Sequence, residues 1–323
     1  MSPSRTVLIT GGTGFVGSHI VAAFLEAGHS VRCTVRATSS LRWLETGSVE
    51  TVETDLGREM TFEKALHGVR LVVHAAGLTS APRARQFREV NTAATERLAE
   101  AAAEAGVERF VFVSSLAARG PDGRDGPTSP YGVSKREAEE RLRRLEPGLP
   151  VVVLRPGGVY GPRDPDLVPL FRLASGGWVF RPASDPPVQP VYATDVARAA
   201  VRAAHGGRSG EAGFGPYPVA DSRSYSWREI GSALAAALGR PVRSVRVPRL
   251  AYEIAGRAGS VWGFIRGVSP GFDVRRARDL ARYSWTCDTS ATRKALGWSP
   301  DVSLGDGIER TLRWYREVGW VRG

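Results

Sequence analysis

The sequence predicts an α/β protein with a doubly wound parallel sheet and a smaller, mostly helical C-terminal lobe. Short β-rich runs alternate with helical patterns in the first half, which is typical of a parallel sheet covered on both faces. A glycine-rich turn directly follows the first of these runs. Beyond Arg155 the chain becomes rich in Gly and Pro and then mainly helical, which indicates a second, smaller unit.

Seven β-rich runs provide candidate strands for this sheet, at residues 6–10, 30–35, 50–53, 71–74, 109–114, 151–154 and 214–219. Helical patterns predict helices at 17–27, 87–105, 131–145, 167–174, 193–204, 227–238, 250–257, 290–296 and 305–318. Apart from its short helix, the Gly- and Pro-rich segment 157–190 is expected to form loops. We therefore expect a nucleotide-binding domain at 1–160 plus about 191–220, and a substrate-binding lobe at about 161–190 plus 221–323.

Composition excludes several classes of function. The formal net charge of the 323-residue chain is +11, spread along its length and carried almost entirely by arginine, because Lys64, Lys135 and Lys294 are the only lysines. A nucleic-acid binder gathers its basic residues on one face or in one run, so we expect no nucleic-acid partner. Cys33 and Cys287 form neither a disulfide framework nor a zinc pattern, which favours a reducing, cytoplasmic location without a metal site.

No apolar run reaches the roughly 18 residues that a membrane span needs, and the N-terminal residues do not have the pattern of a signal peptide. We therefore expect no membrane association.

The glycine-rich turn has the spacing of a dinucleotide-binding turn. Gly11, Gly14 and Gly17 follow a β-rich run and open a helix. In such a turn the first glycine permits a tight bend, the second lets the backbone approach a pyrophosphate, and the third lets helix and strand pack closely. The helix N-terminus then offers N–H groups and a positive dipole end to the phosphates. This predicts a Rossmann-type domain whose cofactor contacts include Gly11, Thr13, Gly14, Phe15 and Val16.

The end of the second strand favours NADP(H) over NAD(H). A carboxylate at this position would bind the ribose 2′-hydroxyl of NAD, but the strand ends in Arg36, followed by hydroxyl residues that include Ser39. A cation with hydroxyls suits a 2′-phosphate instead. After the third strand, Asp55 and Leu56 either meet the adenine or belong to an ordinary turn. Small residues after the fourth strand leave room for a cofactor against the backbone; they are Ala75, Ala76 and Gly77.

A phenol and an ammonium group lie four residues apart on one face of a predicted helix, at Tyr131 and Lys135. A nearby cation favours the phenolate and lowers the pKa of a tyrosine, which could then exchange a proton with a substrate oxygen while hydride moves. Lys135 could also hold the nicotinamide ribose. Ser114 and Ser115 end a strand beside this pair, and the hydroxyl of Ser115 is expected to hydrogen-bond the developing oxyanion.

Taken together, these residues resemble the extended short-chain dehydrogenase/reductases, the epimerase/dehydratase-like group. The resemblance implies a Ser115/Tyr131/Lys135 triad, a cofactor along the strand C-termini that also touches Ser114, and a substrate under the C-terminal lobe. It also implies that Pro156 and Val159 line the nicotinamide end. The motifs concerned are residues 10–17 (TGGTGFVG), 55–56 (DL), 74–77 (HAAG), 90–91 (VN), 114–115 (SS), 131–135 (YGVSK), 155–162 (RPGGVYGP), 191–195 (VYATD), 296–298 (LGW) and 314–315 (WY).

Within that family the chain looks most like the 3β-hydroxysteroid dehydrogenase/dihydroflavonol reductase-like branch. Members that dehydrate nucleotide sugars carry an Asp-Glu pair soon after the active-site hydroxyl, whereas here Ser115 is followed by Leu116, Ala117 and Ala118. This similarity favours interconversion of a ketone and a secondary alcohol on a small, fairly apolar substrate. A homodimer is common in the family, and Asn91 is expected to be a structural or cofactor-proximal residue.

Three alternatives stay open from the sequence. A nucleotide-sugar epimerase would use the same triad but return the hydride to the same substrate. A non-catalytic NADP-sensing or interaction protein typically loses the Tyr/Lys pair, which is intact in this chain. The apolar stretch 250–272 is either a lid over the substrate or ordinary C-terminal core.

Overall fold

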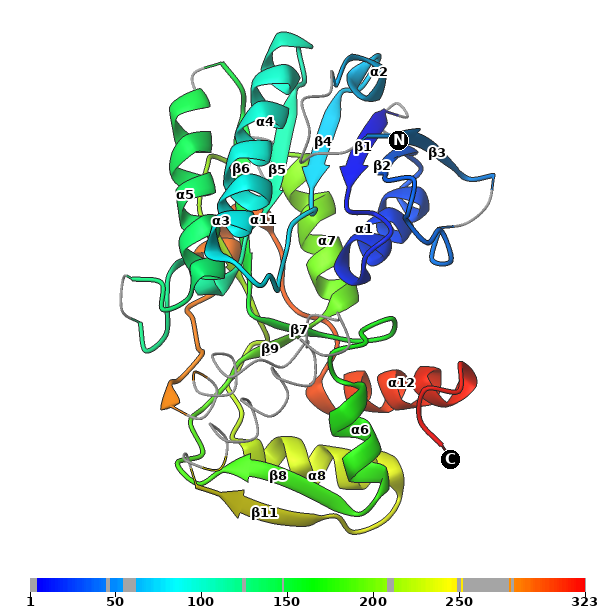
Figure 1. Ribbon diagram of the computed structural model, residues 1–323, viewed down its shortest axis with the longest axis vertical. Helices are drawn as coiled ribbons and strands as arrows, with labels where there is room; N and C mark the ends of the chain where they lie inside the picture. Colours follow the sequence, from blue (N-terminus) through cyan, green and yellow to red (C-terminus); the bar gives the residue numbers. More distant parts are fainter. Residues whose placement is uncertain are drawn as a thin grey trace.

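The computed structural model describes residues 5–44, 47–54, 62–123, 126–146, 148–207, 212–248, 251, 279 and 282–322. A sheet covered by helices on both faces forms one end of the molecule, and a smaller group of helices and short strands forms the other (Figure 1). No helix of these ranges combines the length and apolar character that a bilayer span requires.

Seven parallel strands make up the central sheet, in the order β10-β6-β5-β4-β1-β2-β3. Several strands are buried on both faces, as expected for a parallel sheet between two layers of helices. The order turns back between β1 and β4, so their carboxyl ends border the crevice in which such sheets bind ligands. The strands are β1 (Thr6–Thr10), β2 (Ser30–Val35), β3 (Val49–Glu53), β4 (Leu71–His74), β5 (Arg109–Val113), β6 (Val151–Pro156) and β10 (Tyr217–Val219).

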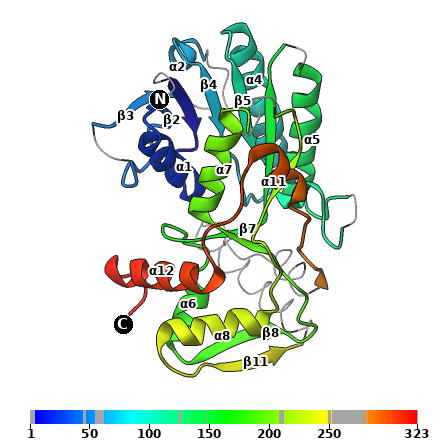
Figure 2. The same ribbon diagram turned by 180° about the vertical axis from the view of Figure 1, so that it is seen from behind.

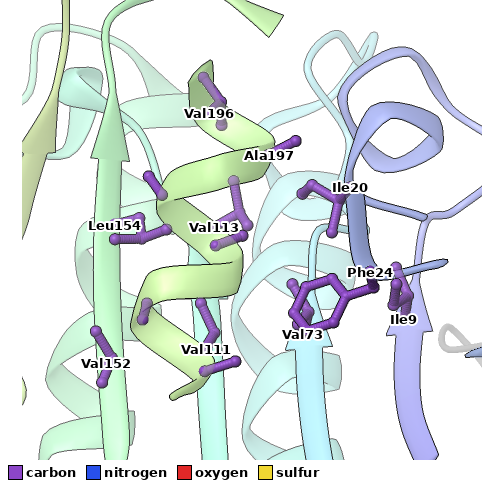
Figure 3. Packing of buried hydrophobic residues seen from close by; sticks show 14 of the residues in the cluster. Ile9, Ile20, Phe24, Val73, Val111, Val113, Val152, Leu154, Val196 and Ala197 are labelled. Atoms are coloured by element: carbon purple, nitrogen blue, oxygen red, sulfur yellow. The ribbon is translucent and has the colours of Figure 1, made fainter. Parts of the chain in front are cut away.

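Alternate residues of the strands feed two separate hydrophobic clusters. Ile9, Val73 and Val111 pack on one face with Phe24 of α1 (Phe15–Glu26) and Val196 of α7 (Ala193–Ala204), as Figure 3 shows. The neighbouring strand residues pack on the other face against α2 (Glu63–Leu66), α4 (Ala94–Glu104) and α5 (Pro130–Leu145). From behind, α1, α7 and α11 (Ser290–Leu296) cover the first face (Figure 2).

A third cluster holds together the group that we call the C-terminal lobe. Its elements are α6 (Val168–Ser175), β8 (Trp178–Pro182), α8 (Trp227–Leu238), β11 (Arg243–Val247) and α12 (Leu304–Glu317). Phe171, Leu234, Ile308 and Tyr315 are buried at its centre. Between the lobe and the sheet, β7 (Gly158–Tyr160) pairs in parallel with β9 (Pro190–Tyr192).

Segment 157–190 corrects the sequence prediction, because it contains three strands where loops around a helix were expected. β7 and β9 are three residues long, and β8 pairs with β11, which lies some sixty residues later in the chain and was not predicted as a strand. Such short strands depend on pairing with distant partners, which local propensity cannot reveal.

The predicted helix at 87–105 is also composite. It comprises α3 (Ala84–Phe87), a π-helical turn at Arg88–Ala93 and then α4. The stretch 250–272 lies outside the described residues, except Ala251.

The carboxylate of Asp195 joins the sheet to the segment that leads into α12. It lies in the first turn of α7, is fully buried, and accepts hydrogen bonds from the backbone N–H groups of Asp301 (3.0 Å) and Val302 (3.2 Å) and from the Arg198 guanidinium (2.7 Å). Its backbone carbonyl accepts a hydrogen bond from the indole of Trp298. Burial raises the pKa of Asp195 from its ordinary value, so these donors are what keep a charged group acceptable there.

We predict that Asp195→Ala lowers the free energy of unfolding by about 3 kcal/mol, because it leaves the backbone N–H groups of Asp301 and Val302 without their acceptor and removes one of the two carboxylates that bind Arg198. Urea denaturation followed by circular dichroism measures the loss. Glu309→Ala is the matched control, since Glu309 makes an exposed ion pair with Arg313 on α12 and its removal should cost less than about 0.5 kcal/mol. Equal losses in the two variants would contradict the role assigned to Asp195.

Candidate active site

Two chain segments approach each other at the carboxyl ends of β1 and β4 without room for a side chain. A Cβ atom on Gly17 would lie 2.0 Å from the carbonyl oxygen of Gly11. Gly11 itself has a φ of +73°, and a Cβ there would lie 2.7 Å from the amide nitrogen of Ala76. Gly14 is the N-cap residue of α1 and donates its N–H to the Gly11 carbonyl (3.0 Å). The turn therefore has the close backbone packing and the helix N-terminus that a bound pyrophosphate needs.

The other residues predicted around this turn lie beside it. Thr13, Phe15 and Val16 follow Gly11 at the start of α1 and are partly exposed. Ala75 donates its N–H to the carbonyl of Thr10 (3.1 Å), which carries the pairing of β1 and β4 one residue further. Ala76 and the exposed Gly77 continue from there.

A buried histidine fixes the ends of these two strands, and sequence reasoning gave it no role. One ring nitrogen of His74 lies 2.6 Å from the hydroxyl oxygen of Thr10, and the other lies 2.8 Å from that of Thr95 on α4. Burial, reinforced by the charge of Lys135, lowers the pKa of His74 to about 3. The imidazole is therefore neutral under ordinary conditions and serves to hold β1, β4 and α4 together.

The segment after β2 folds back on itself. Arg36 and Ser39 exchange two hydrogen bonds, from the Arg36 N–H to the Ser39 hydroxyl (2.9 Å) and from the Ser39 N–H to the Arg36 carbonyl (2.8 Å). Arg36 is exposed, so this turn offers a positive charge beside the glycine turn of the adjacent strand β1. Asp55 and Leu56 lie outside the described residues.

Lys135 is buried on the inner face of α5. The residue is only 4% exposed, and its ammonium donates a hydrogen bond to the Val113 carbonyl at the end of β5 (3.0 Å). The same ammonium lies 4.7 Å from the centre of the Phe112 ring. Burial lowers the pKa of Lys135 to about 8, while the carboxylate of Glu139 opposes this effect. The group is therefore still largely a cation at neutral pH.

Tyr131 occupies the first turn of α5, one helical turn before Lys135. The helix begins there because Ser129 caps it, accepting a hydrogen bond from the Gly132 N–H, and Pro130 follows the cap. Gly132 lets the helix pack directly on the segment after β5, since a Cβ there would lie 2.4 Å from the Ala117 carbonyl oxygen. The half-buried Tyr131 ring contacts Phe87, with 6.2 Å between ring centres.

The two serines after β5 face different partners. Ser115 caps a short 3-10 turn (Leu116–Ala118), and its hydroxyl oxygen accepts a hydrogen bond from the Ala117 N–H (3.1 Å). An accepting hydroxyl keeps its own proton to donate, so Ser115 retains the capacity to bind an oxyanion. The Ser114 hydroxyl instead donates to Glu139.

Glu139 is a further residue of this site that sequence reasoning missed. It lies one helical turn beyond Lys135, is 5% exposed, and accepts two hydrogen bonds from the Nε of Arg155 on β6 (3.0 and 3.2 Å) besides a contact from its terminal nitrogen. The spacing of four residues after Lys135 was the available signal. Glu139 places a negative charge one helical turn from Lys135. Its bonds with Arg155 and Ser114 tie α5 to β6 and to the end of β5.

Asn91 lies in the π-helical turn and is fully buried. Its side-chain amide pairs with both backbone groups of Leu78 (2.7 and 2.9 Å) and donates to the Ser134 hydroxyl (3.1 Å). Its oxygen would lie 3.0 Å from a Cβ atom on Gly77, and the Lys135 ammonium would lie 3.4 Å from the same point. Asn91 therefore holds the segment after β4 against α5, close to the ammonium.

The residues expected at the nicotinamide end lie at the end of β6, the strand that pairs with β5, and in β7. Pro156 is buried at the end of β6, and the half-buried Val159 lies in β7 and packs against the cluster between the sheet and α7. The described residues thus bring the glycine turn, the segment after β4, the end of β5 and the start of α5 to one edge of the sheet.

Comparisons with known proteins show similarity to one enzyme family and to several of its relatives along nearly the whole chain. A model of the NAD dependent epimerase/dehydratase family matches residues 7–214. A ceramide reductase of Caulobacter vibrioides is 32% identical, and the match covers 98% of this chain and 96% of that protein. A UDP-glucose 4-epimerase of Vibrio cholerae is 28% identical over 96% of this chain and 95% of that protein. The solved UDP-glucose 4-epimerase of Thermotoga maritima with UDP-glucose has a TM-score of 0.77 and 25% identity, covering 97% of this chain and 99% of that one.

We predict that Glu139→Gln lowers the pKa of Lys135 below about 8, by about one pH unit, because the amide removes the negative charge that favours the ammonium. The measurement is the pH dependence of lysine acylation by acetic anhydride, quantified by mass spectrometry. Lys64 serves as the internal reference, since the chain has only three lysines.

Glu140→Gln is the control for this prediction, because Glu140 is the exposed neighbour that pairs with Arg136. An unchanged acylation midpoint at Lys135 in Glu139→Gln would show that the carboxylate has no effect on the ammonium.

Proposed function

Since this chain belongs to the NAD-dependent epimerase/dehydratase family of extended short-chain dehydrogenase/reductases, we propose that it is an NADP(H)-dependent oxidoreductase that interconverts a ketone and a secondary alcohol on a small, fairly apolar substrate. The observation that carries the proposal is the buried ammonium of Lys135, held 3.0 Å from the Val113 carbonyl one helical turn from Tyr131. An ammonium at this depth favours loss of the phenol proton, which is the property an acid–base tyrosine needs.

The chain's own residues divide the chemistry as follows. In the reducing direction the Tyr131 hydroxyl gives its proton to the substrate oxygen, Lys135 stabilises the phenolate that remains, and Ser115 donates a hydrogen bond to the same oxygen. Bound NADP(H) would supply the hydride to the carbonyl carbon. The oxidising direction reverses each of these steps.

The glycine positions fit a dinucleotide. A side chain at Gly11 would collide with Ala76 and one at Gly17 with the Gly11 carbonyl, so only glycine allows this tight turn. We assign the pyrophosphate to the exposed Gly14 and the partly exposed Gly11, Thr13, Phe15 and Val16. We assign Ala75, Ala76, Gly77, Ser114, Pro156 and Val159 to the remaining contacts of the cofactor, together with Asp55 and Leu56 at the adenine.

The preference for NADP(H) rests on the end of β2. The exposed guanidinium of Arg36 and the Ser39 hydroxyl stand where an NAD-binding domain carries a carboxylate. A 2′-phosphate would be attracted by that charge, whereas the 2′-hydroxyl of NAD(H) gains nothing comparable from it.

An apolar substrate is supported by the similarity to a ceramide reductase along nearly the whole chain. Segment 114–118 adds to this support, because it lacks the Asp-Glu pair expected of a nucleotide-sugar dehydratase. We further propose that residues 1–160 plus about 191–220 bind the cofactor, that about 161–190 plus 221–323 bind the substrate, and that the protein is a cytoplasmic homodimer.

A nucleotide-sugar epimerase is the second candidate, favoured by the similarity to UDP-glucose 4-epimerases in both sequence and structure. Such an enzyme returns the hydride to its own substrate and consumes no added NADPH. The two candidates are separated by incubating the protein with a panel of long-chain ketones, steroid ketones, flavonoids and UDP-sugars. Net loss of NADPH with a ketone supports the reductase, and interconversion of UDP-sugars without such loss supports the epimerase.

We predict that Tyr131→Phe lowers kcat by about 10²- to 10⁴-fold with the ketone that the panel identifies, because the variant has no proton to exchange. The dissociation constant for NADPH should change little, since the ring remains. Absorbance of the reduced nicotinamide measures the rate, and equilibrium dialysis measures binding.

Tyr217→Phe is the control for Tyr131→Phe, because Tyr217 lies in β10 near Arg109 and packs in the hydrophobic cluster on the face of the sheet opposite α5, so the loss of its hydroxyl should leave kcat unchanged. Normal turnover by Tyr131→Phe would instead favour a non-catalytic or NADP-sensing protein.

A further inference from the structure

Four aromatic rings meet where the segment after β2 touches the C-terminal lobe. Trp43 lies 5.3 Å from Trp314 and 6.4 Å from Trp320, measured between ring centres. Trp314 and Trp320 lie 5.0 Å apart and both contact Tyr315. These spacings are those of favourable edge-to-face and tilted aromatic pairs. We refer to these four residues as the aromatic junction.

Two arginines bind the face of the junction. The Arg42 guanidinium lies 4.3 Å from the centre of the Trp43 ring and 5.7 Å from that of Trp320. The Arg163 guanidinium, from the segment after β7, lies 5.7 Å from the Trp43 ring centre. Both distances are within the range of cation–π attraction. Besides its neighbour Arg42, Trp43 thus contacts two separate parts of the chain, the segment after β7 and the C-terminal end of α12 with the residues that follow it.

The segment that contributes Arg163 also reaches the phosphate-binding helix. A ring nitrogen of His19 on α1 lies 2.9 Å from the Pro162 carbonyl oxygen, and the Tyr315 hydroxyl donates to the Asp164 carbonyl (2.6 Å). Burial lowers the pKa of His19 to about 4, so its ring is neutral and this contact persists at ordinary pH. The glycine turn, the segment after β2 and the end of α12 are therefore in one continuous set of contacts.

Trp43 also stands four residues beyond Ser39 and shares a short segment with Arg36. The two hydrogen bonds between Arg36 and Ser39 lie within the turn itself and do not tie it to the C-terminal lobe. Trp43 connects this segment to the lobe, because its ring packs on α12 and on the residues that follow α12.

We propose that Trp43 is a positioning residue for the adenosine end of the cofactor: it fixes the turn of Arg36 and Ser39 against α12, so that binding of a 2′-phosphate and ordering of α12 stabilise each other. This inference rests on the cofactor assignment of the proposed function. Coupling between two sites is reciprocal in binding free energy, so each effect requires the other.

The first test compares dissociation constants of NADPH and NADH for wild type, Trp43→Ala, Trp320→Ala and Trp178→Ala, by equilibrium dialysis. Trp43→Ala and Trp320→Ala should each weaken NADPH by about tenfold, with a much smaller effect on NADH, which lacks the 2′-phosphate. In an Arg36→Ala background, Trp43→Ala should have no further effect on NADPH. Trp178 is the control, because it is an exposed tryptophan on β8 outside the junction and its loss should change neither constant.

The second test measures amide hydrogen exchange in α12 with and without NADP⁺. Wild type should gain protection there when the nucleotide binds, and Trp43→Ala should lose that gain. Equal weakening of NADPH and NADH, an equal effect of Trp178→Ala, no preference of wild type for NADPH, or unchanged protection of α12 in Trp43→Ala would each overturn the inference. None of these readouts needs turnover, so a wild type that reduces no ketone removes the reductase assignment while the binding data still decide the role of Trp43.

Discussion

Close backbone contacts at Gly11 and Gly17 set the geometry where α1 meets the carboxyl ends of β1 and β4. Gly17 lies so close to the Gly11 carbonyl that α1 can start only where no side chain separates it from the end of β1. Gly11 in turn lies against Ala76, so β1, α1 and the segment after β4 share one tightly packed corner. Because this packing is backbone against backbone, it places the N-terminus of α1 directly at the end of β1, and a helix N-terminus in that position suits a pyrophosphate.

Two buried residues of opposite charge on α5, Lys135 and Glu139, are the second feature on which the site depends. Burial alone would drive Lys135 towards its neutral form, and an unpaired Glu139 would be equally unfavourable. The two groups lie one helical turn apart, and Arg155 and Ser114 satisfy the carboxylate from the neighbouring strands. The cationic state of the ammonium is therefore a property of three secondary-structure elements and not of the helix alone.

The sequence was informative wherever structure is local. The limits of β1, β2, β4, α7, α8 and α11 agree with those predicted, because apolar runs between turn residues and helix-forming periodicity specify them within a few residues. Glycine spacing and the Tyr131/Lys135 spacing likewise led to residues that lie at one edge of the sheet. Contacts between distant segments were not accessible in this way: the pairing of β8 with β11, the bond of Glu139 to Arg155, and the meeting of Trp43 with Trp320 each join residues that no local pattern relates.

The order in which the chain supplies its layers has a consequence for how the protein forms on the ribosome. Strands β1 to β6 are complete by Pro156, yet one apolar face of that sheet is covered partly by α7, which begins only at Ala193, and the edge strand β10 follows later still. Until those residues emerge, side chains such as Val111 and Leu154 have no helix over them. The nascent N-terminal half therefore exposes an apolar surface for the time needed to synthesise α6, β8 and α7. Chaperone binding at this stage would protect the chain from aggregation.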